Sequence, residues 1–357
     1  MKRQLLGVAA ILLSISTYAQ DNPLWMRYCA ISPDGTTIAF TYKGDIYTVP
    51  STGGRASQIT TNPAHDTKPI WSPDGKKIAF ASDRMGSMDI FEVNKEGGIP
   101  KRLTTHSGNE TPVAYKDAGH ILFLANIMPT AEDAQFPSGQ FQQVYEVNTE
   151  GGRPILFSSM PMEDISINHT GNTLLYHDKK GYEDPWRKHH TSSITRDIWL
   201  CSLNGNRTFR KQTAFNGEDR TPVWASDDKS FYYLSEEKGS FNIFKRDIDG
   251  NTSKQITNHT KHPVRFLSAA SNGTLCYGYD GEIYTVKEGA IPQKVQISIV
   301  TDKNDKDLIR QIKRSGATEI SLSSDAKEIA FVLRGDVYVT STEYSTTKQI
   351  TNTPQQE

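Results

Sequence analysis

The stretch that decides the fold is WSPDGKKIAFAS, residues 71–82, because it repeats an earlier stretch almost letter for letter. Residues 31–42 read ISPDGTTIAFTY, so the two copies begin forty positions apart. In Ser-Pro-Asp-Gly, proline occupies the second place of a turn and glycine the place that needs a positive φ. The apolar run Ile-Ala-Phe that follows is typical of a buried strand. The sequence therefore predicts a β-hairpin that occurs at least twice in the chain.

Five further stretches keep the same pattern of a turn followed by an apolar strand. They are AYKDAGHILF (114–123), ISINHTGNTLLY (165–176), WASDDKSFYY (224–233), SAASNGTLCY (268–277) and LSSDAKEIAF (322–331). Each unit carries four short strand signals, and a second turn recurs with glycine, as at Gly53, Gly97 and Gly151. A long period of this kind in an all-β chain predicts a β-propeller with one four-stranded blade per repeat.

The number of blades in the ring is left open by the sequence. Six units fit between about residues 24 and 298, and then the charged stretch VTDKNDKDLIRQIKRSGA breaks the pattern before a seventh unit. We favour a six-bladed ring plus the start of a second propeller; the alternative is one seven-bladed ring. The expected division is a signal peptide at 1–19, the propeller at 20–300, a charged linker at 301–317 and a single further blade at 318–357.

The first residues, MKRQLLGVAAILLSISTYA, have a basic start, an apolar core and a small residue at position 19. This layout predicts a secretory signal peptide, and hence a periplasmic or otherwise exported protein that is soluble once the peptide is removed. Forty basic and forty-one acidic residues give no electrostatic case for binding nucleic acid, and no later segment predicts membrane insertion. Cys29, Cys201 and Cys276 form either one disulfide and a free thiol, or three separate buried thiols.

The repeat resembles the Pro-Asp propeller repeat of TolB and of the N-terminal propellers of tricorn-type peptidases. The matching residues in the second unit are Pro69, Trp71, Ser72, Pro73, Asp74, Gly75, Asp89, Leu103 and Thr104. In the fifth unit they are Pro222, Trp224, Asp227 and Asn242 to Phe244, whereas the third, fourth and sixth units keep the spacing without the Pro-Asp pair. The propeller follows the signal peptide almost directly, without the preceding domain that TolB carries, and this favours the tricorn type.

The resemblance implies a module that admits or guides peptides toward a serine-peptidase domain, which this chain does not include. We therefore expect a fragment or truncated reading frame of a longer peptidase, with peptides as ligands. The alternative is a TolB-like scaffold that binds proteins of the cell envelope.

Known catalytic signatures are missing from the sequence. It has no Gly-x-Ser-x-Gly elbow, His-Glu-x-x-His motif, phosphate loop or Cys-x-x-Cys pair. We therefore predict no catalytic residues, no cofactor, no metal site and no enzymatic activity for this chain alone.

Two insertions between the second and third strands of neighbouring blades are candidate binding loops, at residues 126–141 and 177–196. The second predicts a ligand or partner site made of Tyr182, Trp186, Arg187, Lys188, His189 and His190. The alternative is a solvated loop whose Trp186 packs on its own blade. Acidic residues also recur just ahead of the inner strands, at Asp66, Glu110, Glu163 and Asp219. They form either a ring of carboxylates at one mouth of the channel or caps on the connections between blades.

Overall fold

The computed structural model describes residues 23–127, 141–182, 184, 186, 192–300 and 313–351. Within these ranges every helix or strand is a β-strand, and the strands form seven four-stranded antiparallel sheets and one two-stranded sheet. The predicted all-β propeller class is confirmed. The predicted signal peptide (1–19) and most of the charged linker (301–317) lie outside the described residues. No described helix has the length and hydropathy that crossing a membrane requires.

Each four-stranded sheet is formed by strands that are consecutive or nearly consecutive in the chain. The first three sheets are β1 (Arg27–Ile31), β2 (Thr37–Tyr42), β3 (Asp45–Pro50) and β5 (Ser57–Gln58); β6 (Asp66–Trp71), β7 (Lys77–Ser82), β8 (Asp89–Asn94) and β9 (Lys101–Arg102); and β10 (Thr111–Asp117), β11 (His120–Ala125), β12 (Gln143–Asn148) and β13 (Ile155–Ser158).

The next three sheets follow the same order. They are β14 (Met162–Ile167), β15 (Thr173–Asp178), β16 (Ile198–Ser202) and β17 (Phe209–Lys211); β18 (Asp219–Trp224), β19 (Ser230–Ser235), β20 (Asn242–Asp247) and β21 (Ser253–Gln255); and β22 (Arg265–Ala269), β23 (Leu275–Tyr279), β24 (Glu282–Val286) and β25 (Gln293–Lys294). The last sheet is β27 (Ala317–Leu322), β28 (Glu328–Leu333), β29 (Asp336–Ser341) and β30 (Thr347–Gln349).

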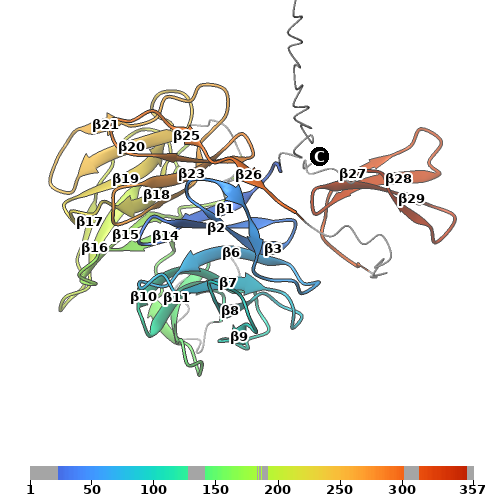
Figure 1. Cartoon of the computed structure of the whole chain (residues 1–357), viewed down its shortest axis with the longest axis horizontal. Helices are drawn as coiled ribbons and strands as arrows, with labels where there is room; N and C mark the ends of the chain where they lie inside the picture. Colours follow the sequence, from blue (N-terminus) through green and yellow to red (C-terminus); the bar gives the residue numbers. More distant parts are fainter. Residues whose placement is uncertain are drawn as a thin grey trace, which may run out of the picture.

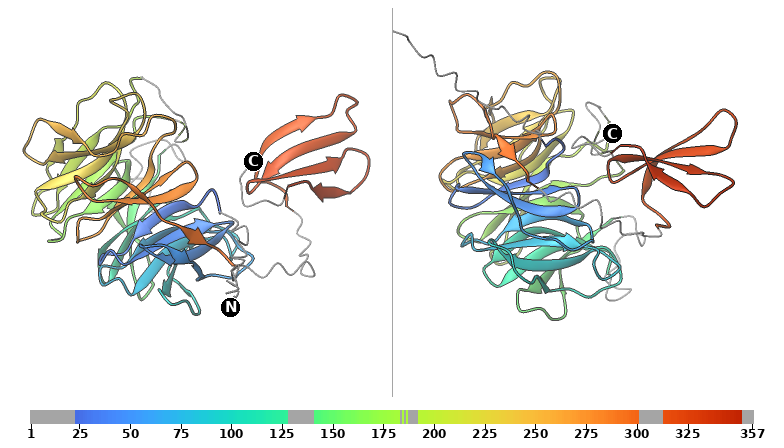
Figure 2. Two further views of the ribbon diagram at one scale, coloured as in Figure 1. Left: turned by 45° about the horizontal axis from the view of Figure 1, so that its top comes forward. Right: turned by 45° about the vertical axis from the view of Figure 1, so that its right-hand side comes forward.

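The first six sheets follow one another around a common axis (Figure 1). Their first strands, β1, β6, β10, β14, β18 and β22, lie nearest the axis, and β22 lies beside β1. The β27–β30 sheet lies outside this ring in all three ribbon views (Figures 1 and 2). Its first strand is exposed along its whole length.

The Ser-Pro-Asp-Gly hairpins owe their shape to hydrogen bonds within the turn. In the second sheet, the Asp74 carboxylate accepts hydrogen bonds from the Ser72 hydroxyl at 2.7 Å and from the Lys76 N–H at 3.1 Å. Gly75 has a φ of +67°, a conformation that a Cβ would disfavour. The same aspartate contacts recur at Asp34 and Asp325.

Adjacent sheets bury the aromatic residues that alternate along their second and third strands. Stacked pairs bridge these two strands in several sheets, among them Phe80–Phe91, Phe123–Tyr145 and Tyr277–Tyr284. A tryptophan at the end of an inner strand adds a link to the preceding sheet. Trp71 Nε1 donates to the Ala30 carbonyl at 2.8 Å, and Trp224 Nε1 donates to the Ser166 carbonyl at 3.0 Å.

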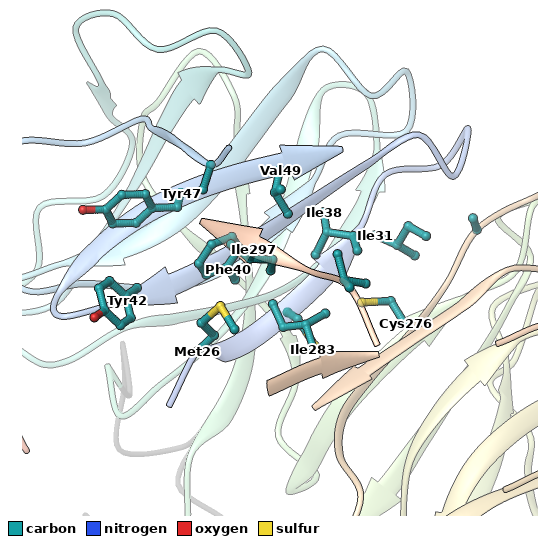
Figure 3. Packing of buried hydrophobic residues seen from close by; sticks show 14 residues of the cluster. Met26, Ile31, Ile38, Phe40, Tyr42, Tyr47, Val49, Cys276, Ile283 and Ile297 are labelled. Atoms are coloured by element: carbon teal, nitrogen blue, oxygen red, sulfur yellow. The ribbon is translucent and has the colours of Figure 1, made fainter. Parts of the chain in front are cut away.

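The ring closes where the first and sixth sheets meet (Figure 3). There the short strands β4 (Gly54–Arg55) and β26 (Ile297–Ser298) pair in parallel, so the segment after the sixth sheet runs beside a turn of the first. Ile297 packs in one buried cluster with Phe40, Ile283 and Cys276. Backbone bonds add to the seam, such as Met26 N–H to the Gly281 carbonyl at 3.1 Å.

Candidate functional site in the central channel

The inner strands of the ring share an irregularity close to the start of each strand. In β1, β6, β14, β18 and β22 the antiparallel register shifts, and one residue that is not glycine has a φ between +48° and +58°. These residues are Tyr28, Lys68, Asp164, Thr221 and Phe266. The register of β10 shifts as well, between Pro112 and Ala114. A β-bulge of this kind turns a side chain away from its regular direction, at a cost of roughly 1–2 kcal/mol when a non-glycine residue becomes left-handed.

The five left-handed residues line a cavity of about 620 Å³ on the axis of the ring. All six inner strands contribute to its wall, with residues 28–30, 68–70, 111–113, 163–166, 220–223 and 265–268. The volume is that of a site for a small ligand or for a short segment of a larger one. The repeated bulge therefore places one reoriented side chain per strand at a single central site.

Positive charge predominates in the lining of the cavity. Its charged side chains are Lys68, Lys179, Arg196, Arg220 and Arg265 on the basic side, and Glu163 and Asp164 on the acidic side. Burial lowers the pKa of Arg265 to about 10, and repulsion from Arg220 contributes to this shift. An anion bound among these cations would relieve that repulsion.

The acidic wall is held by a network from the fourth and fifth sheets. Glu163 lies 2.7 Å from Lys179 Nζ and 3.3 Å from His177 Nε2. Thr221 N–H donates to His177 Nδ1 at 3.2 Å, and the Thr221 hydroxyl donates to Asp164 at 2.7 Å. Burial alone would raise the pKa of Glu163, but the neighbouring His177 and Lys179 bring it well below its usual value. Glu163 is therefore a fixed anion, and its position is set by neighbouring side chains.

Trp186, from the insertion between β15 and β16, reaches residues of the first and sixth sheets. Its ring centroid lies 4.9 Å from the guanidinium carbon of Arg27 and 5.0 Å from that of Arg265. Its carbonyl accepts a hydrogen bond from Arg265 Nη2 at 2.6 Å, and its ring is 6.0 Å from that of Phe266. Trp186 therefore links the insertion of the fourth sheet to Arg27 of the first sheet and Arg265 of the sixth. The indole remains 43% exposed, so it offers a flat apolar surface held by two cations.

The other predicted residues of this loop are placed less centrally or lie outside the described residues. Tyr182 lines the cavity but is 92% exposed, with Lys179 Nζ 6.0 Å from its ring centroid. Arg187, Lys188, His189 and His190 lie outside the described residues. Of the six predicted loop residues, the structure therefore brings Trp186 and Tyr182 to the cavity.

Three of the four predicted carboxylates lie inside the protein. Asp66 is fully buried and accepts hydrogen bonds from Arg84 Nη2 at 2.9 and 3.0 Å. Glu110 and Asp219 are also buried, and burial raises the pKa of each to about 7. These three carboxylates do not line the cavity. Among the four, Glu163 is the one that lines the cavity.

The most central residues of the site were not singled out from the sequence. Lys68 and Thr221 each stand directly before a repeat proline, Pro69 or Pro222, and Tyr28 stands before Cys29 at the matching position. When the repeat units are aligned, these residues occupy the position just before this proline, and that shared position could have identified them. The residue type at the position differs from unit to unit, however, so residue type alone does not identify it.

The cavity offers non-covalent binding through cations, an aromatic surface and fixed carboxylates. In the part of the chain that the structure describes, no three His, Cys, Asp or Glu side chains form a group suited to a metal ion. What the arrangement can do is hold a ligand that combines an anionic group with apolar parts.

Comparison with known proteins gives a family match over most of the chain. The family model described as the tricorn protease N-terminal beta propeller domain matches residues 23–290. Tricorn protease homolog 1 of Streptomyces coelicolor is 25% identical over 281 residues, which cover 78% of this chain and 25% of that protein. The tricorn protease homolog of Saccharolobus solfataricus is 27% identical over 330 residues, covering 88% of this chain and 28% of that protein.

A solved structure agrees with the fold. The crystal structure of the tricorn protease superposes with a TM-score of 0.65 at 19% identity, covering 92% of this chain and 31% of that one. At this identity the likeness concerns the fold alone. The chain spans about a quarter of the length of the curated tricorn relatives described above.

Proposed function

Because the chain belongs to the tricorn protease N-terminal β-propeller family, we propose that it is a non-catalytic propeller module that binds peptide segments in its central cavity. The observation that carries this proposal is the left-handed bulge residue that five inner strands direct into one cavity. Backbone strain repeated at one site is expensive for a purely structural ring, and such strain is typical of ligand sites.

The lining of the cavity indicates the chemistry of the peptide. Lys179 pairs with Glu163 at 2.7 Å, and Arg196 and Arg220 lie 2.9 and 3.4 Å from Glu218. Lys68 and Arg265 are therefore the lining cations best placed to favour an anionic group, such as a terminal carboxylate or an acidic side chain. Trp186, Tyr28 and Phe266 supply aromatic surface for an apolar side chain beside it. We therefore infer a peptide that presents a carboxylate next to an apolar residue.

Calorimetry with matched peptides tests this function. Hexapeptides with an apolar last residue are compared as free acids and as C-terminal amides, at low and at moderate salt. We expect the acids to bind at least ~10-fold more tightly than the amides, with an affinity that falls as salt rises. Lys68→Ala should weaken binding, whereas Lys95→Ala, on an outer turn, should leave it unchanged.

The outcomes separate the two parts of the proposal. Equal binding of acids and amides would remove the anionic preference but keep peptide binding. If neither series binds to the folded protein, and acidic peptides fail as well, the function proposed here is wrong.

We also propose that the protein is exported, on the strength of residues 1–19. Sequencing the N-terminus of protein recovered from the periplasm or medium should give a chain that begins at Gln20. Full-length, unprocessed protein confined to the cytoplasm would contradict export.

A further inference from the structure

Two of the three cysteines meet at the seam where the ring closes. Cys29 lies on β1 of the first sheet and Cys276 on β23 of the sixth, and they are 3% and 0% exposed. Both belong to the same buried cluster. Nearly the whole ring lies between them in the sequence.

Cys29 and Cys276 flank the same contact between the two sheets, and both are free thiols in the structure. The Ser268 hydroxyl lies 3.4 Å from the Cys29 carbonyl oxygen and 3.5 Å from the Cys276 carbonyl oxygen, and Cys29 Sγ donates to the Phe266 carbonyl oxygen at 3.5 Å. Cys201 is also buried but packs in a different cluster, formed around the third and fourth sheets. Cys29 and Cys276 are therefore the pair that the fold brings together.

Cys29 also departs from the repeat at an informative position. The second and fifth units have proline at the matching place, Pro69 and Pro222. Proline fixes φ and suits the strand beside the bulge, so a cysteine gives up that conformational gain. Cysteine at this position thus places a thiol at the seam between the first and sixth sheets, in the same buried cluster as Cys276.

We propose that Cys29 and Cys276 form a disulfide that joins the first sheet of the ring to the sixth. The donor is a disulfide of a thiol oxidoreductase or of glutathione. One cysteine thiolate attacks a donor sulfur to give a mixed disulfide. The second thiolate then displaces the donor thiol, so the two protein thiols are oxidised and one donor disulfide is reduced to two thiols.

Burial decides when the bond forms. Burial in the seam, followed by contact with Cys29, raises the pKa of Cys276 well above its usual value, so the closed ring holds little reactive thiolate. Oxidation therefore takes place while the seam is open during folding, and the finished bond is shielded from reductants. Its natural setting, an oxidising compartment, rests on the proposed export, but the test below does not.

The test refolds the whole chain in a glutathione redox buffer and counts thiols. After denaturation and alkylation without reductant, intact-mass analysis should show one alkyl group, on Cys201, and peptide mapping should recover Cys29 linked to Cys276. With reductant, three groups should be added. Three groups without reductant, or a bond that involves Cys201, would overturn the proposal.

Thermal unfolding with and without reductant gives the independent measurement. The wild type and the control Cys201→Ser should lose roughly 5 °C or more of Tm on reduction, because a cross-link across most of the chain restricts the unfolded state. Cys276→Ser should show no such loss. Cys29→Pro, which restores the repeat residue, provides a second variant of that site. A reductant effect that persists in both variants would contradict the assignment.

Discussion

Five residues of the channel occupy a backbone conformation that non-glycine residues normally avoid. Tyr28, Lys68, Asp164, Thr221 and Phe266 belong to four chemical classes, so no single side-chain interaction explains the shared conformation. What they share is their place at the register shift near the start of an inner strand, and each of them lines the cavity. The left-handed backbone at each of these positions therefore lowers the stability of the protein, while the side chain becomes part of the cavity wall.

Lys68 allows this strain to be measured without disturbing the core. Because Lys68 is left-handed, Lys68→Gly should have a free energy of unfolding about 1 kcal/mol higher than that of Lys68→Ala. In urea unfolding the glycine variant should therefore have the higher midpoint. At Lys95, an outer-turn residue with an ordinary φ, the order should reverse, with the glycine variant less stable than the alanine variant. If the alanine variant were more stable than the glycine variant at position 68 as well as at position 95, the bulge in β6 would be unstrained.

Buried acids at the connections between sheets make stability depend on pH. Burial raises the pKa of Glu110 to about 7, above the value near 4.3 expected in the unfolded chain. The folded protein then binds more protons at Glu110 in this interval. The contribution of Glu110 to stability is therefore fully present below about pH 4 and is lost as pH rises through about 7.

Glu110→Gln should remove this part of the pH dependence. Between pH 5 and pH 8 the wild type should lose about 1–3 kcal/mol of unfolding free energy relative to Glu110→Gln, as measured by urea unfolding at each pH. Glu96→Gln, on an exposed turn, is the control and should follow the wild type. Parallel curves for the wild type and Glu110→Gln would contradict a protonated Glu110.

At the scale of the element, the turn between the third and fourth strands of the first sheet also contacts the segment that closes the ring. Gly53 and Gly97 have nearly the same φ, +91° and +93°. A Cβ on Gly53 would come within 2.7 Å of the Gln296 carbonyl oxygen, next to β26, whereas a Cβ on Gly97 would be 3.6 Å from the nearest atom, the Ile59 oxygen. The same turn thus receives the closing segment only in the first sheet.

The matched pair Gly53→Ala and Gly97→Ala isolates this contact. Both variants should lose stability through backbone strain, and Gly53→Ala should lose about 1–2 kcal/mol more because β26 must move. Urea unfolding monitored by tryptophan fluorescence would measure the difference. Equal losses would mean that the parallel pairing of β4 and β26 contributes little to closure.

Elements with a local cause were predictable from the sequence, and those set by ring geometry were not. The Ser-Pro-Asp-Gly turns and the alternating strands follow from φ preferences and from side-chain periodicity, and they appear as expected. The bulges leave no recurring residue type in the sequence, since Lys68 and Thr221 occupy the same place in their strands, and β26 is too short to produce a pattern. The position of Trp186 against the first and sixth sheets depends on residues far apart in the chain.

At the scale of the whole molecule, we propose that the ring (20–300) is one domain and that the last sheet begins a second one. The β27–β30 sheet leaves Ile320 72% exposed, although the matching positions of ring sheets are buried against neighbours. It approaches the ring at Arg334, 4.0 Å from Asp83. A single exposed ion pair of this kind adds little stability.

Removing residues 301–357 should therefore leave the ring intact. We expect the unfolding free energy of the shortened chain to stay within ~0.5 kcal/mol of the full chain. A chain that ends at Pro292 is the contrast: it lacks buried Val295 and Ile297 and should lose about 3–6 kcal/mol. A marked loss on removing 301–357 alone would show that the last sheet supports the ring.

The bulges also affect how the protein can change over evolutionary time. Each of the five left-handed residues comes from a different strand, but some of them contact one another. The rings of Tyr28 and Phe266 lie 4.9 Å apart, and Phe266 also packs against the buried cluster of the seam. The Thr221 hydroxyl donates to Asp164 at 2.7 Å, so a codon change at either residue also affects the strand that carries the other. In descendants of a single ancestral ring, we therefore expect substitutions at Asp164 and Thr221, and at Tyr28 and Phe266, to accumulate in pairs.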